Sequence, residues 1–243
     1  MEISMTKSKG LTSNALKLIA IAAMLIDHIA WGFVPFGSPL AQIMHVIGRI
    51  TAPTMCFFIA EGYYHTHNVK KYALRLGIFA LISYLPFVFF ESHSWPPTQW
   101  SLLNVIYTLF LSLLALWAWD KIENKLFSTL IIIGLCILSM PGDWTFFAIL
   151  YTLAFGIHRG NFKEQARWFS IISILMVLLA SIFDVTSHYA FYKDFFQLGV
   201  FLALPLLSLY KGERGGGKYS KWIFYIFYPT HLLILAVLAI LIK

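Results

Sequence analysis

Charged residues are scarce in this chain of 243 residues: Asp, Glu, Lys and Arg make up 12% of it, whereas 59% of the residues are hydrophobic. Soluble globular domains carry about 25% charged and about 45–50% apolar residues. A soluble domain of this length would need far more polar surface to cover its core. The composition therefore predicts an integral membrane protein in which residues 1–243 form a single membrane domain.

Cysteine is rare as well. The two thiols, Cys56 and Cys136, both lie inside apolar runs and lack the paired spacing of a disulfide framework or a zinc site. We therefore expect no metal. Acidic residues are also few, 11 against 18 Lys and Arg, which leaves a formal charge of +7. Such an excess can indicate nucleic-acid binding, so the positions of the cations along the chain decide how it is interpreted.

Apolar segments follow one another along the chain and predict an all-α, polytopic protein with about nine transmembrane helices, within a range of eight to ten. They cover residues 16–33, 40–63, 72–90, 102–119, 126–138, 144–157, 168–185, 195–209 and 222–242. The fifth and sixth segments are short for the ~20 residues that a crossing needs. The turn at 140–143 therefore joins either two crossings or a re-entrant hairpin, and the other segments keep their sides in both cases.

Basic residues alternate between the two sides of this arrangement. Fifteen of the eighteen lie near the N-terminus or in every second loop: Lys7, Lys9, Lys17, Lys70, Lys71, Arg75, Lys121, Lys125, Arg159, Lys163, Arg167, Lys211, Arg214, Lys218 and Lys221. Only Lys193 and Lys243 lie on the opposite side, and Arg49 lies within a span. The positive-inside rule then predicts a cytoplasmic N-terminus and an outer C-terminus. This topology accounts for the excess of basic residues, so the charge does not indicate nucleic-acid binding.

Ionisable groups inside membrane spans are costly and usually mark sites or pathways. The set here is Asp27, His28, His45, Arg49, Glu61, Asp184 and His231. His28 lies twelve residues into its helix, about 18 Å from the inner edge and a little beyond the middle of a ~30 Å core. Arg49 lies at a similar depth, and His231 about 13 Å into the last helix. We therefore expect His28, Arg49 and His231 to meet near the middle of the bilayer.

Lys17 and His28 are eleven residues apart, which is within about 20° of three full helical turns. Both side chains therefore project from the same face, about 16.5 Å apart along the axis. This distance matches the reach of an extended pantetheine arm, with a cationic anchor for its phosphates at the cytoplasmic side. The spacing thus suits coenzyme A. The alternative is a snorkelling interfacial Lys17 and a His28 that is satisfied within the core.

Asp27 adjoins His28, but neighbours on a helix point about 100° apart, so they are not automatically an acid–base couple. The alternative for Asp27 is a buried ion pair with Arg49 that packs the first two helices together. His45, four residues before Arg49, either extends this cluster outward or caps it, and we favour capping.

Glu61 lies near the cytoplasmic end of the second helix and indicates a polar mouth; its alternative is an interfacial ion pair with Lys71 or Arg75. His231 follows Pro229, one of four prolines inside apolar spans, where a kink would present it to a cavity. A histidine that packs helices together remains the alternative for His231.

Several stretches of the sequence resemble the TraX family: LKLIAIAAMLIDHIAWGF, IGRITAPTMCFFIAEGYYHT, KYALRLGIFALISYLPF, NVIYTLFLSLLAL and FYIFYPTHLLIL. These are polytopic bacterial proteins named for the enzyme that N-acetylates the pilin subunit of conjugative pili. The resemblance extends from Leu16 to about Leu235, and the block from 47 to 87 is the most specific. One departure is Tyr84, where the family often has an acidic residue.

The family resembles the wider transmembrane acyltransferases, in which a basic residue precedes a helical histidine by eleven positions. The resemblance implies a single acyltransferase-like domain in the bacterial inner (cytoplasmic) membrane that transfers an acetyl group from cytoplasmic acetyl-CoA to an amine or hydroxyl acceptor, such as a pilin N-terminus. His28 would be the general base, with Asp27 and Arg49 beside it as catalytic residues. Arg49 is the first choice as oxyanion donor.

The same resemblance assigns the remaining candidates. Donor binding is expected of Lys17, Glu61, Lys71 and Arg75, and acceptor binding of Asn104 and His231. Asn104 is also the second choice as oxyanion donor, and an acetyl-enzyme at His28 or Cys56 stays open.

Two other classes of function remain open. A proton-coupled transporter would use the ionisable residues of the spans, Asp27, His28, Glu61 and His231, as a relay and would release no CoA. A structural membrane subunit would not depend on His28 at all.

Overall fold

The computed structural model describes residues 10–217 and 220–242, and its regular elements in these ranges are all helical, as predicted. Their bounds are α1 (Ser13–Phe33), α2 (Pro39–Gly48), α3 (Thr51–His65), α4 (Val69–Ser92), α5 (Val105–Lys121), α6 (Lys125–Leu138), α7 (Thr145–Ile157), α8 (Phe162–Thr186), the 3-10 helix η1 (Phe195–Leu202), α9 (Ala203–Ser208) and α10 (Ser220–Ile242). Each predicted apolar segment coincides with one or two of these elements.

Five segments are long and apolar enough to cross a membrane: Ser13–Phe33, Pro39–His65, Val69–Ser92, Phe162–Thr186 and Trp222–Ile242. The predicted count of nine spans is not confirmed. Lys125–Leu138, Thr145–Ile157 and Phe195–Ser208 are apolar but shorter. A 14-residue helix such as α6 is only about 21 Å long at ~1.5 Å per residue, less than a ~30 Å hydrocarbon core.

The second predicted span is not one continuous helix. α2 ends at Gly48 and α3 begins at Thr51, and Arg49 and Ile50 form a turn between them. Pro53 contributes to this break because it has no N–H to donate to the carbonyl of Arg49, four residues earlier. The break places His45 of α2 and Arg49 of the turn next to α1.

Polar side chains set where the helices begin. Asn68, Asn104, Asn124 and Asn161 precede α4, α5, α6 and α8, and each accepts a hydrogen bond from a backbone N–H of the first turn. Such caps satisfy donors that a helix end otherwise leaves unpaired. In a chain with little polar surface, these asparagines separate the apolar segments.

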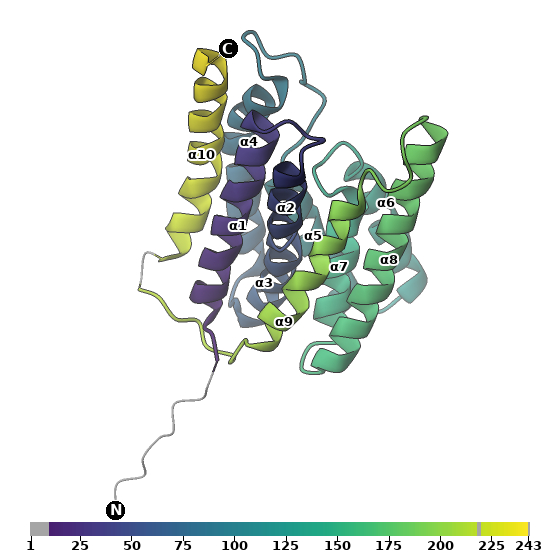
Figure 1. Cartoon of the computed structure of the whole chain (residues 1–243). Coiled ribbons are helices and arrows are strands. Elements are labelled where there is room, and N and C mark those ends of the chain that lie inside the picture. Colours follow the sequence, from purple (N-terminus) through teal and green to yellow (C-terminus); the bar gives the residue numbers. More distant parts are fainter. Residues whose placement is uncertain (1–9, 218–219, 243) are drawn as a thin grey trace, which may run out of the picture.

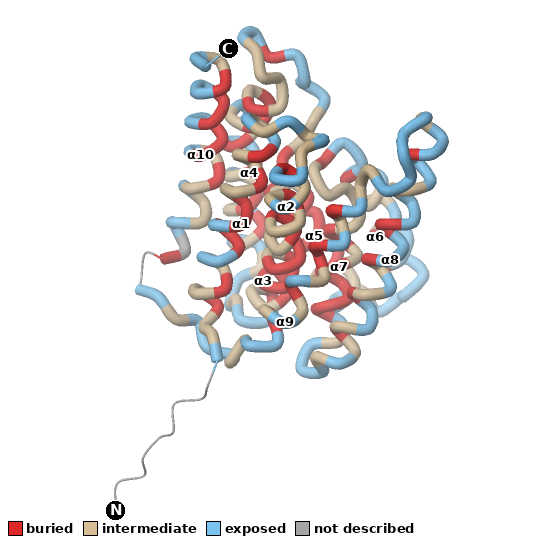
Figure 2. The backbone as a smooth tube through the Cα atoms, in the orientation of Figure 1, coloured by how far each residue is buried: buried red, intermediate tan, exposed pale blue. Residues whose placement is uncertain are grey.

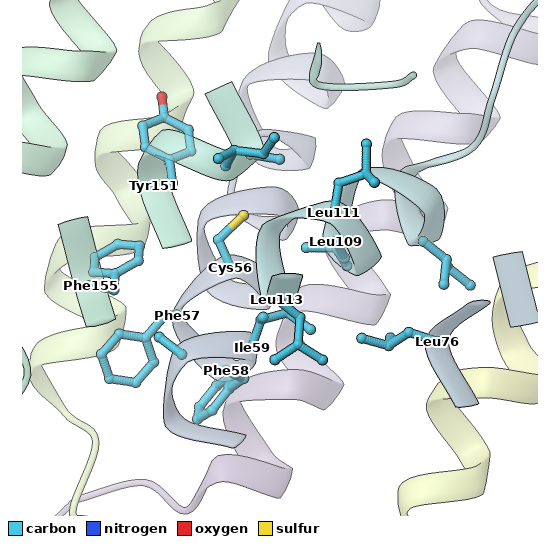
Figure 3. Close-up of a cluster of buried hydrophobic side chains, with 14 of the residues drawn as sticks. Cys56, Phe57, Phe58, Ile59, Leu76, Leu109, Leu111, Leu113, Tyr151 and Phe155 are labelled. Carbon is cyan, nitrogen blue, oxygen red and sulfur yellow. The ribbon is translucent and has the colours of Figure 1, made fainter. Parts of the chain in front are cut away.

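α3 lies at the centre of the bundle and packs against α1, α5 and α7, while α10 packs against α1 and α4 (Figure 1). Buried residues concentrate in these inner elements, and the outer faces of α6, α8 and α10 are exposed (Figure 2). The core cluster in Figure 3 joins Cys56, Phe57 and Ile59 of α3 to residues of α5 and α7. The exposed outer residues are large and apolar, as expected of side chains that face lipid.

The loops predicted to be cytoplasmic gather at one end of the molecule, where α1 and α10 begin (Figure 1). Leu11 pairs with Tyr210, and Ser13 N–H bonds to the carbonyl of Glu213 at 2.8 Å. The Tyr63 hydroxyl donates to Asp120 at 2.6 Å, which joins the ends of α3 and α5. The described cations of these loops thus share one end. Lys7, Lys9 and Lys218 lie outside the described residues.

Replacing Gly48 by alanine is expected to destabilise the protein. An added Cβ would lie 2.3 Å from the Cβ of Asp27, so α1 and α2 would have to separate. Overpacking of this kind costs about 1–3 kcal/mol. The measurement is the melting temperature of purified protein in detergent. Gly134→Ala is the matched control because an added Cβ there meets nothing within 4 Å. Equal melting temperatures for the two variants would contradict the close packing at Gly48.

Candidate functional site

A cavity of about 1100 Å³ lies inside the bundle. One face of α1 lines it at intervals of three or four residues: Ser13, Lys17, Ile21, Met24, Asp27, His28 and Trp31. From residue 13 to residue 31 this face is about 27 Å long at ~1.5 Å per residue. The cavity therefore runs from the basic end of the molecule almost to its opposite end, and Lys17 and His28 share the face that their spacing predicts.

His28 lines this cavity and contacts His231, which lies behind it and outside the cavity lining, so the expected place of His231 on a cavity wall as an acceptor-binding residue is not observed. Nε2 of His231 lies 3.2 Å from Nδ1 of His28, and Nδ1 of His28 also lies 2.9 Å from the carbonyl oxygen of Met24. Nδ1 of His231 lies 2.8 Å from the carbonyl oxygen of Phe227. The structure thus brings together two of the three residues expected to meet in mid-membrane.

These bonds define the tautomer of both rings. A carbonyl oxygen only accepts, so each Nδ1 carries a hydrogen and Nε2 of His231 is left as an acceptor. The Nδ1–H of His28 is then shared between Met24 and His231. In the neutral imidazole, Nε2 of His28 holds a lone pair, which is the form that a general base requires.

Asp27 is the centre of a second buried cluster. Its Oδ1 accepts from Nδ1 of His45 at 2.8 Å, and its Oδ2 accepts from Nη2 of Arg49. Nη1 of Arg49 donates to Gln197 at 3.4 Å, and the guanidinium lies 5.0 Å from the ring centroid of Trp144. The alternative of a packing ion pair between Asp27 and Arg49 is confirmed, and His45 belongs to the cluster through a direct bond to Asp27.

Lys17, Arg75 and Arg214 line the cavity at its basic end. Nζ of Lys17 lies 4.9 Å from the ring centroid of Phe58, and Nε of Arg75 donates to the hydroxyl of Tyr225 at 3.0 Å. A cation on an aromatic face keeps its charge available to an anion on the other side. This end of the cavity is a cationic mouth, as the sequence indicated.

Two predictions at this mouth differ from the structure. Glu61 lines the cavity, as its interpretation as part of a polar mouth predicts, but it pairs with Nε of Arg159 at 2.7 Å, so the alternative of a pair with Lys71 or Arg75 is wrong. Arg159 follows α7, which the fold brings against α3. Lys71 is exposed and is not among the cavity-lining residues.

Asn104 has a structural role. Its amide donates to the carbonyl of Ala80 at 2.8 Å, and its Oδ1 caps α5 by accepting from the N–H of Ile106 and Tyr107. It lies outside the cavity lining. Cys56 is fully buried in the core cluster and also lies outside this lining. Tyr84 donates to the carbonyl of Trp100, away from the cavity.

Sequence reasoning missed several residues at the end of the cavity opposite the mouth. Glu91, Asp143, Trp144 and Tyr228 line it there. Burial raises the pKa of the loop residue Asp143 to about 6. Tyr228 could have been found from its spacing, because it precedes His231 by three residues on one helix and shares its face. Asp143 gave no such signal, because only tertiary contacts fold its turn against the cavity.

These features define a protein whose described elements are helical, with several helices that can cross a membrane. They surround an internal cavity that has a cationic mouth and, on its wall, His28 with His231 behind it. The chain belongs to the TraX family, whose model, described as TraX protein, matches residues 12–239. The resemblance seen in the sequence is thereby confirmed.

Two relatives extend this comparison. The chain is 29% identical over 238 residues to a probable fimbrial assembly protein FimC, serogroup H1, of Dichelobacter nodosus, covering 95% of this chain and 97% of that protein. It is 34% identical over 77 residues to the uncharacterized protein RP591 of Rickettsia prowazekii (strain Madrid E), covering 31% of this chain and 29% of that protein. No solved structure matches.

Removing one partner of the Asp27–Arg49 pair should destabilise the protein more than removing both. Asp27→Asn or Arg49→Gln leaves a buried charge uncompensated, which costs about 3–5 kcal/mol. The double variant keeps the shapes and loses both charges, so its melting temperature should lie above that of either single variant. Melting temperatures in detergent test this, and additive losses would show that the two charges do not interact.

Proposed function

We propose that this protein is an integral membrane acetyltransferase that moves an acetyl group from cytoplasmic acetyl-CoA to an amine or hydroxyl acceptor. A pilin-like N-terminus in the bacterial inner membrane is the favoured acceptor, an assignment supported by the TraX family and by the name of the fimbrial assembly relative. One observation carries the proposal: the wall of a cavity that reaches the cationic mouth includes His28, whose Nε2 holds a lone pair.

The cationic mouth suits the phosphates of coenzyme A. Lys17, Arg75 and Arg214 supply positive charge there, and charge-assisted hydrogen bonds to phosphate are among the strongest that side chains form. Lys17 and His28 lie about 16.5 Å apart along α1, so an extended pantetheine arm that starts at the mouth brings its thioester to His28. The cavity of about 1100 Å³ offers room for such an arm and for an acceptor.

The chemistry assigns a role to each group near the thioester. The acceptor nitrogen or oxygen attacks the thioester carbonyl while Nε2 of His28 takes its proton. The tetrahedral intermediate then expels the CoA thiolate, and His28 returns the proton to it. His231 holds the ring of His28 in the required tautomer. Arg49 is the favoured oxyanion donor, because it lines the cavity and its Nε–H is buried without a partner among the described residues.

A proton-coupled transporter remains the alternative, because the cavity extends along most of the bundle. Two residues of the expected relay, Asp27 and Glu61, are held in ion pairs with Arg49 and Arg159, which favours the enzyme. Accumulation of a solute in vesicles without release of CoA would support the transporter instead.

His28→Ala is expected to lower acetyl transfer by about 10²–10⁴-fold, the usual contribution of a general base, while acetyl-CoA still binds. The assay is transfer of labelled acetyl from acetyl-CoA in proteoliposomes, with membrane extracts from cells that express the protein as the source of acceptor. His158→Ala is the control, since His158 stacks on Trp168 and lies outside the cavity lining. Full turnover by the His28 variant would exclude the base.

Lys17→Ala should chiefly weaken donor binding. A hydrogen bond to a charged group is worth about 1.5–3 kcal/mol, so the Kd of acetyl-CoA should rise roughly 10- to 100-fold. Equilibrium binding of acetyl-CoA to the purified protein measures this. Lys163→Ala provides the matched control, because Lys163 is an exposed cation at the same end of the molecule. An unchanged Kd would remove Lys17 from the donor site.

A further inference from the structure

The end of the cavity opposite the cationic mouth has the opposite charge. Glu91, in the last turn of α4, and Asp143, in the turn between α6 and α7, both line it. The ring of Phe90, which precedes Glu91, lies 5.3 Å from that of His28, so this acidic end adjoins the histidine pair. Arg49 lies nearby, but its ion pair is with Asp27. Two carboxylates would repel acetyl-CoA, which is a polyanion, so these two do not belong to its binding site.

Tyr228 supplies a second, independent observation at the same place. It lines the cavity and is only 3% exposed. Within residues 10–217 and 220–242 its hydroxyl forms no hydrogen bond of good geometry, and only the backbone N–H of Val105 lies close to its oxygen. Leaving a buried hydroxyl unpaired costs about 1–3 kcal/mol, so an unpaired one on a cavity wall indicates a ligand that pairs with it. The ring of Tyr228 lies 5.7 Å from that of His231.

The two carboxylates and this hydroxyl are close enough to interact electrostatically with one another. In the described part of the chain, neither carboxylate takes part in a salt bridge. Like charges at one site repel, and a cation between them removes the repulsion while leaving both carboxylates ionised. A protonated primary amine fits this requirement, because it carries one positive charge and three N–H donors for three oxygen atoms.

We propose that Glu91, Asp143 and the hydroxyl of Tyr228 bind the ammonium group of the acceptor beside His28. The proposal rests on the proposed function and selects an amine over a hydroxyl acceptor. The proposal also says where the two protons go that an ammonium group loses when it becomes an amide. The ammonium gives its first proton to a carboxylate, which frees the nitrogen lone pair to attack the thioester. The second proton goes to Nε2 of His28 and then to the departing CoA thiolate.

The test is equilibrium binding of a neutral tetrapeptide amide with a free N-terminus to the full-length protein in detergent. The same peptide with an acetylated N-terminus is the comparison ligand. We expect the free amine to bind the wild-type protein at least tenfold more tightly. This preference should fall to less than twofold in the Glu91→Gln/Asp143→Asn double variant and should weaken in Tyr228→Phe. Asp194→Asn is the control, because Asp194 is a carboxylate outside the cavity lining.

Equal binding of the two peptides to the wild-type protein, or a preference that persists in the double variant, would overturn the ammonium site. Acetyl-CoA binding by each variant shows whether the fold is intact, and the single Glu91→Gln variant replaces the double one if it fails this check. The peptide measurement does not depend on acetyl transfer. A preference for the free amine without any transfer from acetyl-CoA would refute the proposed function and leave the ammonium site standing.

Discussion

The buried carboxylate of Asp27 is the interaction on which the geometry of the site depends. It accepts hydrogen bonds from His45 in α2 and from Arg49 in the turn before α3, so one side chain of α1 ties together both halves of a broken helix. In a low-dielectric interior these three groups are stable only together, because each alone would be an unpaired charge or an unpaired polar group. The break between α2 and α3 and the close packing of Gly48 against Asp27 both allow this contact.

The orientation of His28 follows from that cluster. Residues 27 and 28 point about 100° apart on α1, so a carboxylate directed at α2 and α3 leaves the neighbouring imidazole directed at α10. There it contacts His231 on α10, a continuous helix that contains Pro229. The two neighbouring side chains therefore have different surroundings: Asp27 joins helices, and His28 lies on the cavity wall with His231 behind it. The two clusters are adjacent in sequence but have different partners.

The polarity of the cavity matches a transfer between two sides of a membrane. Its mouth is cationic, its far end is acidic, and His28 lies between them. A polyanionic donor and a cationic acceptor would be drawn to opposite ends by this field.

Much of the fold could be predicted from composition and periodicity. The helical class, the apolar segments and the shared face of Lys17 and His28 were predictable, because hydrophobic runs and helical spacing are local properties. The Asp27–Arg49 pair was one of two interpretations of Asp27, and only the tertiary structure selected it. The number of segments that cross the membrane could not be predicted, because α6 and α7 are as apolar as a transmembrane helix but shorter than one. Asn104 was misjudged because a polar residue before an apolar run can cap a helix as readily as it can act in a site.

By itself, the sequence determined which groups are buried in the membrane domain and along which helical faces they recur. Only the tertiary structure decided their partners. Arg159 pairs with Glu61 across 98 positions, and His231 with His28 across 203. Glu91, Asp143 and Tyr228 come from three separate elements. Such contacts depend on how helices pack across the bundle, and helical periodicity carries no information about which face of one helix meets which face of another.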